Sequence, residues 1–210
     1  MGLSFGQNHL QEAQGEVSHI QSYDLNGYVM DNWKFLEKRV HEIEKDLTIP
    51  KGFFWSLLKE DDWSFIIKLH SLIEAAVTQL LLKEIARPEL ENVFANIELS
   101  NSRAGKMVFL KDLGLLKPYH RYVRVLSEIR NDFVHNISNV KVSLKEYLDN
   151  KPDQKNNLFK SIQNVYNKEL KLKDLSGVEK RVSETFKYDL LFISLFMLSN
   201  IYLHTRPKKL

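Results

Sequence analysis

Apolar residues recur at helical spacing wherever this chain shows a sustained pattern, and that periodicity limits the possible folds more than any other feature. Between residues 24 and 47 the apolar positions are separated by three, four or five residues: Tyr28, Trp33, Leu36, Val40, Ile43 and Leu47. Residues 61–86 form a second such segment, with acidic residues at its start and Pro88 just after its end. We find no sustained strand-like alternation. The pattern predicts an all-α fold, most simply a helical bundle.

The spacing of turn-forming residues supports this reading. Eight glycines and five prolines are few for 210 residues, so tight turns are sparse. Further helices are expected over 99–113, from Pro118 to about 137, and over 177–204, with the clearest loop at 148–157. The chain then divides into a flexible N-terminus (1–20), an N-terminal helical extension (21–55), a bundle (56–206) and a basic tail (207–210). The extension can pack on the bundle or reach a partner chain.

Composition excludes some chemistry. The chain has no cysteine, which removes disulfides, thiolate metal ligands and cysteine nucleophiles and fits a reducing cytosol. A net charge of +3 permits contact with nucleic acid without arguing for it. We see no signal peptide, and the most apolar stretch, 188–203, is shorter than the roughly 20 residues of a membrane span and contains Asp189 and Asn200. We therefore expect a cytoplasmic protein without membrane contact.

Three charged residues fall where helical periodicity places apolar ones. Glu74 lies within the apolar stripe of 61–86, Arg103 aligns with the apolar residues of 99–113, and Arg130 falls among those of 118–137. A lone ionised group in a core is costly, so each needs a partner. We expect a buried network of Glu74 with Arg103, Arg130 or both, because a guanidinium can donate two parallel hydrogen bonds to one carboxylate. Such a network can equally be a structural salt bridge and nothing more.

The polar side of the same segment carries a second group. Asn131 and His135 are four residues apart, so their side chains can touch on a helix. Lys117, Arg124 and Glu128 share that side. A histidine on a polar face is ordinarily a solvated surface residue, and the remaining histidines are assigned no role.

Together these residues spell a recognisable motif. The stretch Arg130-Asn131-Asp132-Phe133-Val134-His135 has the form R-N-x-x-x-H and resembles the signature of the HEPN superfamily. Two flanking stretches, "LHSLIEAAVTQLL" and "SRAGKMVFLKDLGLL", with "LSEIRNDFVH", are similar to the mannitol-operon-repressor-like branch and related uncharacterised bacterial proteins. The resemblance covers roughly residues 61–137 and the final helix, and does not extend to the first 60 residues.

The resemblance implies a HEPN-like up-and-down bundle, here with an additional N-terminal helix, that dimerises with the motif at the interface. It implies that His135 is the general acid or base, that Arg130 stabilises charge on the phosphorane and that Asn131 orients the phosphate or the histidine. These residue types suit RNA cleavage, because histidine titrates near neutral pH and RNA supplies its own 2′-hydroxyl nucleophile. The reaction needs no metal or other cofactor.

Geometry complicates this assignment. On a straight helix Arg130 and His135 lie about 140° apart, so one chain cannot easily direct both at a single phosphate. Either the helix loosens near "HNISN", or a dimer brings two copies of the motif together. If neither occurs, Arg130 is structural and only the Asn131–His135 face is functional.

Three functions follow as alternatives. The first is a dimeric, metal-independent endoribonuclease of the toxin or defence type. The second is a non-catalytic regulatory or binding module that holds RNA, an antitoxin or another protein partner, and the third is a scaffold in which the motif braces the dimer. Basic residues near the motif and in the tail can follow a phosphate backbone: Lys117, Arg121, Arg124, Arg206, Lys208 and Lys209. The negative charges of Glu128 and Asp132 oppose the attraction of these basic residues for phosphate and favour the regulatory alternative.

Overall fold

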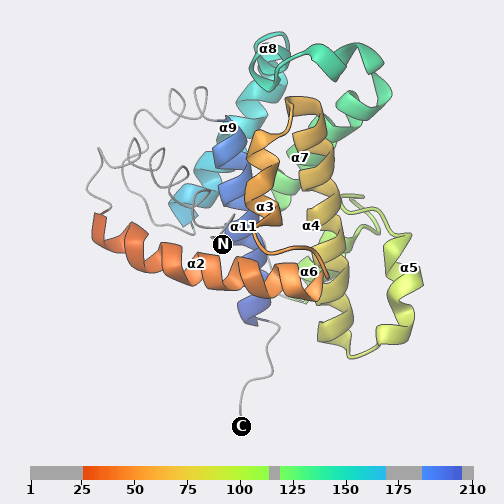
Figure 1. Cartoon of the computed structure of the whole chain (residues 1–210). Coiled ribbons are helices and arrows are strands. Elements are labelled where there is room, and N and C mark those ends of the chain that lie inside the picture. The colour runs from red at the N-terminus through yellow and green to blue at the C-terminus, as the bar shows by residue number, and fades with distance from the viewer. Residues whose placement is uncertain (1–25, 114–118, 169–185, 205–210) are drawn as a thin grey trace, which may run out of the picture.

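The computed structural model describes residues 26–113, 119–168 and 186–204, and all of its regular structure in these ranges is helical (Figure 1). This confirms the all-α prediction. The longer helices are α2 (Asn26–Asp46), α4 (Asp62–Ile85), α7 (His120–His135), α9 (Pro152–Lys168) and α11 (Phe186–His204). Shorter ones connect them: α3 (Phe53–Ser56), η2 (Leu57–Lys59), η3 (Pro88–Leu90), α5 (Glu91–Ala95), α6 (Lys106–Asp112), η5 (Ile137–Lys141) and α8 (Leu144–Asp149).

Helix α4 is the centre of the bundle. It packs against α7 and α11 and also contacts α5 and α6. Its buried side chains therefore lie on more than one face, among them Phe65, Ile66, Leu69, Ile73 and Leu80. Among the described helices, α4 is the one long and apolar enough to cross a membrane, yet 61% of its most apolar window is buried inside the bundle. That burial is compatible with a soluble protein.

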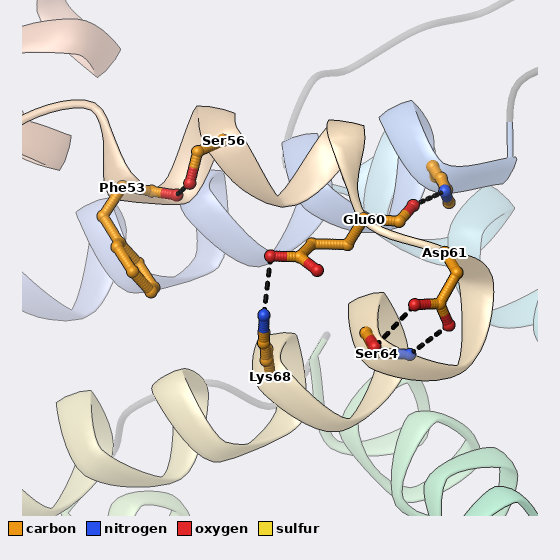
Figure 2. Close-up of polar contacts among 7 residues, drawn as sticks. Phe53, Ser56, Glu60, Asp61, Ser64 and Lys68 are labelled. Carbon is orange, nitrogen blue, oxygen red and sulfur yellow. Dashed lines mark hydrogen bonds and ion pairs between the residues drawn. The ribbon is translucent and has the colours of Figure 1, made fainter.

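The start of α4 is fixed by side chains (Figure 2). Asp61 caps the helix, because its carboxylate accepts hydrogen bonds from the Ser64 amide at 2.9 Å and the Ser64 hydroxyl at 2.6 Å. Just before the cap, Glu60 pairs with Lys68 at 2.6 Å across the first turns of the helix. These acidic residues therefore mark the point where η2 ends and α4 begins.

The N-terminal extension packs on the bundle. Figure 1 shows α2 crossing the direction of α4, and α2 contacts α11. Its buried Leu36 and Val40 belong to the same core as the bundle helices. At its end the buried carboxylate of Glu44 accepts hydrogen bonds from the Gly52 amide at 2.9 Å and the Phe54 amide at 3.2 Å, which holds the start of α3 against α2. Gly52 has a φ of 83°, a conformation that favours glycine.

Two predicted boundaries differ, and others cannot be compared. The expected loop at 148–157 is mostly helical, because Pro152 occupies the first position of α9, where its missing amide proton costs nothing. The expected helix over 99–113 is helical only from Lys106 to Asp112. The final helix is described from Phe186 onward, so the predicted start at 177 lies outside the described residues, as do the predicted flexible N-terminus and the basic tail.

Candidate functional site

The motif occupies the last two turns of α7. One side of this helix is buried against α4 and α9, including Val123, Leu126, Ile129 and Phe133. The helix is continuous through His135 and turns into the short 3₁₀ helix η5 only afterwards. The loosening that would bring Arg130 and His135 to one side of the same chain is therefore not present. Their separation stays at about 140° around the axis.

The end of α7 is held by side-chain hydrogen bonds. The Trp63 indole donates to the Phe133 carbonyl at 2.9 Å, which ties the end of α7 to the start of α4. The Asn139 amide donates to the Asp132 carbonyl at 3.1 Å. The Trp63 bond satisfies a carbonyl that a helix C-terminus otherwise leaves free, and the Asn139 bond adds to the one that the Asp132 carbonyl accepts from the Asn136 backbone amide at 3.1 Å. The end of α7 is therefore tied to both α4 and η5.

Arg130 is half-buried between the apolar and polar sides of α7. Its Nη1 donates to the Oδ1 of the adjacent Asn131 at 3.0 Å. Its Nε is buried and has no hydrogen-bond partner. Within residues 36–113, 119–165 and 186–202 no carboxylate forms an ion pair with this guanidinium. The arginine of the motif thus keeps its charge uncompensated by an acid.

Asn131 and His135 are both exposed on the outer side of α7. Three exposed apolar residues follow or interrupt them in the chain: Val134, Val140 and Ile137, the last 81% exposed. The end of α7 and η5 therefore present a polar pair beside an apolar patch, which we call the α7 end patch and define as Val134, Ile137 and Val140. Single exposed apolar residues are ordinary, but three within seven positions beside the motif form a surface suited to a partner.

Asp132 does not act on the histidine side of the helix. Its carboxylate accepts hydrogen bonds from Tyr147 and Lys151, both at 2.5 Å. Burial works to raise the pKa of Asp132, but the bonds from Lys151 and Tyr147 outweigh it and the pKa is lowered. Because Lys151 compensates this charge, Asp132 weakens a phosphate site less than expected from sequence. Glu128 pairs with Arg124 at 3.6 Å on the exposed side.

The predicted partner of Glu74 is wrong. Arg103 is exposed and lies in a turn before α6, where its backbone amide donates to the Asn101 side chain at 2.9 Å. Glu74 instead accepts a hydrogen bond from Lys106 at 3.0 Å. The Lys106 side chain is 1% exposed and that of Glu74 is 30% exposed. The buried ion pair exists, but it joins α4 to α6 through a lysine and leaves both predicted arginines out.

His70 is a buried histidine, and no role was assigned to it from the sequence. It lies on α4 at 5% exposure, and its Nε2 is 2.9 Å from the Ser127 hydroxyl of α7. Burial lowers the pKa of His70 to about 4; Glu74 opposes that shift, and the positive charges of Arg130 and Lys106 add to it. The ring is therefore neutral at physiological pH, and it shares the α4–α7 seam with the motif arginine.

Two of the three residues near the motif that are predicted to contact phosphate can be located. Arg121 and Arg124 are exposed on α7, with Arg121 donating to Asn157 at 2.9 Å. Lys117 lies outside the described residues. No cluster of three or more metal-binding side chains occurs within the part of the chain that the structure describes.

In comparisons with known proteins, no family model, curated protein or solved structure matches the chain. Any function must therefore be argued from the geometry described above.

Proposed function

We propose that the protein is a metal-independent endoribonuclease of HEPN type that acts in the cytoplasm as a homodimer. The observation that carries the proposal is the ion pair of Glu74 with Lys106: among the residues that the structure describes, no carboxylate is then paired with Arg130. The half-buried guanidinium is thus free to bind an anion beside two exposed polar side chains, Asn131 and His135.

The reaction follows from these residue types. His135 accepts the proton of the ribose 2′-hydroxyl, and the 2′-oxygen attacks the adjacent phosphorus. The bond from phosphorus to the 5′-oxygen breaks, and a histidine returns a proton to that oxygen, leaving a 2′,3′-cyclic phosphate and a 5′-hydroxyl. Arg130 stabilises the charge on the phosphorane, and Asn131, which already accepts a hydrogen bond from Arg130, orients the phosphate. No redox change and no metal-bound water take part.

A second copy of the chain completes this site. Since α7 is unbroken from Arg130 to His135, one chain presents the two side chains in different directions. A twofold axis beside the end of α7 brings Arg130 of one subunit toward His135 of the other. The α7 end patch offers apolar surface for that contact, and Arg121 and Arg124 can follow the RNA backbone on either side.

A specific observation favours one alternative. The α7 end patch and the divergence of Arg130 and His135 also suit a non-catalytic regulatory or binding module, similar to the mannitol-operon repressor family, whose exposed patch holds an antitoxin or other protein partner. In that case the motif residues bind without cleaving.

The test is cleavage of total RNA or transfer RNA in the presence of EDTA. Wild type is compared with His135→Ala and with His41→Ala, which removes an exposed histidine from α2, far from the motif in sequence. The proposal expects cleavage by wild type and His41→Ala and its loss in His135→Ala. A folded dimer of the wild-type chain that leaves both RNAs intact would refute the catalytic proposal and support the binding module.

A further inference from the structure

The contacts of Ser127 favour one tautomer of His70. The Ser127 oxygen lies 2.9 Å from both the Val123 carbonyl and the His70 Nε2. The hydroxyl has a single proton, so both contacts are hydrogen bonds only when that proton goes to the carbonyl and the oxygen accepts from Nε2. This arrangement puts the ring proton on Nε2. In a neutral ring the other nitrogen, Nδ1, is then an unprotonated acceptor.

Two buried atoms in this seam lack hydrogen-bond partners, and they are of opposite kind. One is the His70 Nδ1, an acceptor by the argument above, and the other is the Arg130 Nε, which always carries a proton and can only donate. Buried polar groups are rarely left unsatisfied, so a pair of unmatched donor and acceptor atoms in one interface calls for an explanation.

The packing of the helices brings these atoms toward each other. The contacts of Trp63 with Phe133 and of His70 with Ser127 show that α4 and α7 run antiparallel. Arg130 lies three residues after Ser127 on the same face of α7. Side chains on a helix lean toward its N-terminus, so Arg130 leans back toward Ser127 and the His70 ring.

We infer that His70 is a positioning residue for Arg130: one buried water accepts the Arg130 Nε proton and donates to the His70 Nδ1. The inner edge of the guanidinium is then anchored in the α4–α7 seam, and the outer Nη atoms are directed toward Asn131 and the solvent. The effect on catalysis rests on the proposed function, but the hydrogen bond itself does not.

Two substitutions separate the nitrogens of the ring. In His70→Asn the side-chain oxygen stands near the position of Nδ1, so the acceptor for Arg130 is retained and the donor to Ser127 is lost. In His70→Gln the side-chain nitrogen can reach Ser127, but the acceptor near Nδ1 is lost. The inference expects His70→Gln to lower kcat for RNA cleavage by roughly 10- to 100-fold with little change in KM, and His70→Asn to retain more activity. A purely structural role through Ser127 predicts the opposite order, and that order would overturn the inference.

A readout without RNA keeps the two proposals apart. Nitrogen-15 NMR of the wild-type chain reports the His70 tautomer and the exchange of the Arg130 Nε proton with solvent. We expect protonated Nε2, unprotonated Nδ1 and slow exchange at Arg130, with exchange accelerated in His70→Gln. A proton on Nδ1, or an exchange rate in wild type as fast as that of the exposed Arg121, would refute the inference even if RNA is cleaved. Slow exchange in a chain that cleaves nothing would uphold it while the ribonuclease proposal fails.

Discussion

The ion pair between Glu74 and Lys106 should respond very differently to removal of its two ends. Lys106→Met keeps the packing of the buried stem, and water can reach the 30% exposed side chain of Glu74 that is left behind. We therefore expect this substitution to lower the free energy of unfolding by about 1–2 kcal/mol. Glu74→Ala leaves the ammonium of a 1% exposed lysine without its carboxylate, and loss of one partner from a buried pair costs about 3–5 kcal/mol. Replacing the more exposed Glu74 should therefore destabilise the protein more than replacing the buried Lys106.

Urea unfolding followed by circular dichroism measures both free energies, provided that the slope with denaturant is unchanged. Lys111→Met is the matched control, because Lys111 is an exposed lysine of the same helix, and it should change stability by less than about 0.5 kcal/mol. Equal costs for the two ends, or a larger cost for Lys106→Met, would refute the reasoning. Lys106→Met should also lower any RNA cleavage, since a freed Glu74 can then capture Arg130.

Three further predictions concern other parts of the molecule. Glu44→Ala should destabilise the protein by about 2–3 kcal/mol, because it leaves the Gly52 and Phe54 amides without their acceptor. Thermal unfolding measures the loss, and an unchanged melting temperature would show that those bonds are unimportant. The lowered pKa of Asp132 means that its contribution to stability is present above the ordinary aspartate pKa and is lost as the pH falls through the lowered value. The stability difference between wild type and Asp132→Asn should thus shrink as the pH is lowered from 6 to about 3, and a difference independent of pH would contradict the assigned ion pair. If the proposed dimer forms through the α7 end patch, Ile137→Asp should shift the protein from dimer to monomer in sedimentation velocity. The melting temperature should stay nearly unchanged, since this side chain is 81% exposed; a wild-type monomer, or a dimer unaffected by the substitution, would contradict the proposed interface.

Periodicity predicted the long helices because each has enough apolar residues at helical spacing to form a face that must be buried. The helices expected over 24–47 and 61–86 are present as α2 and α4 with nearly the same ends. The acidic start of 61–86 was expected to mark a helix N-terminus, and Asp61 caps α4 there. The helix around the motif was predicted for the same reason.

The errors arise where local hydrogen bonds override periodicity. The side chain of Asn101 accepts the amides of Arg103 and Ala104, which stabilises a turn where apolar spacing suggested a helix. Because that turn changes the phase of the segment, Arg103 leaves the core and Lys106 enters it. No counting of residues in the sequence reveals such a shift. The role proposed for His70 was equally hidden, because it depends on the two contacts of the Ser127 hydroxyl, and only coordinates give those contacts.

Helix α11 fills the space between α4 and α2, yet the ribosome makes it after every other described helix. Until it emerges, the apolar side chains of α4 and α2 that it covers stay in contact with water, and the nascent chain is exposed to aggregation or chaperone capture. A message truncated before this helix would yield a product that cannot close its core.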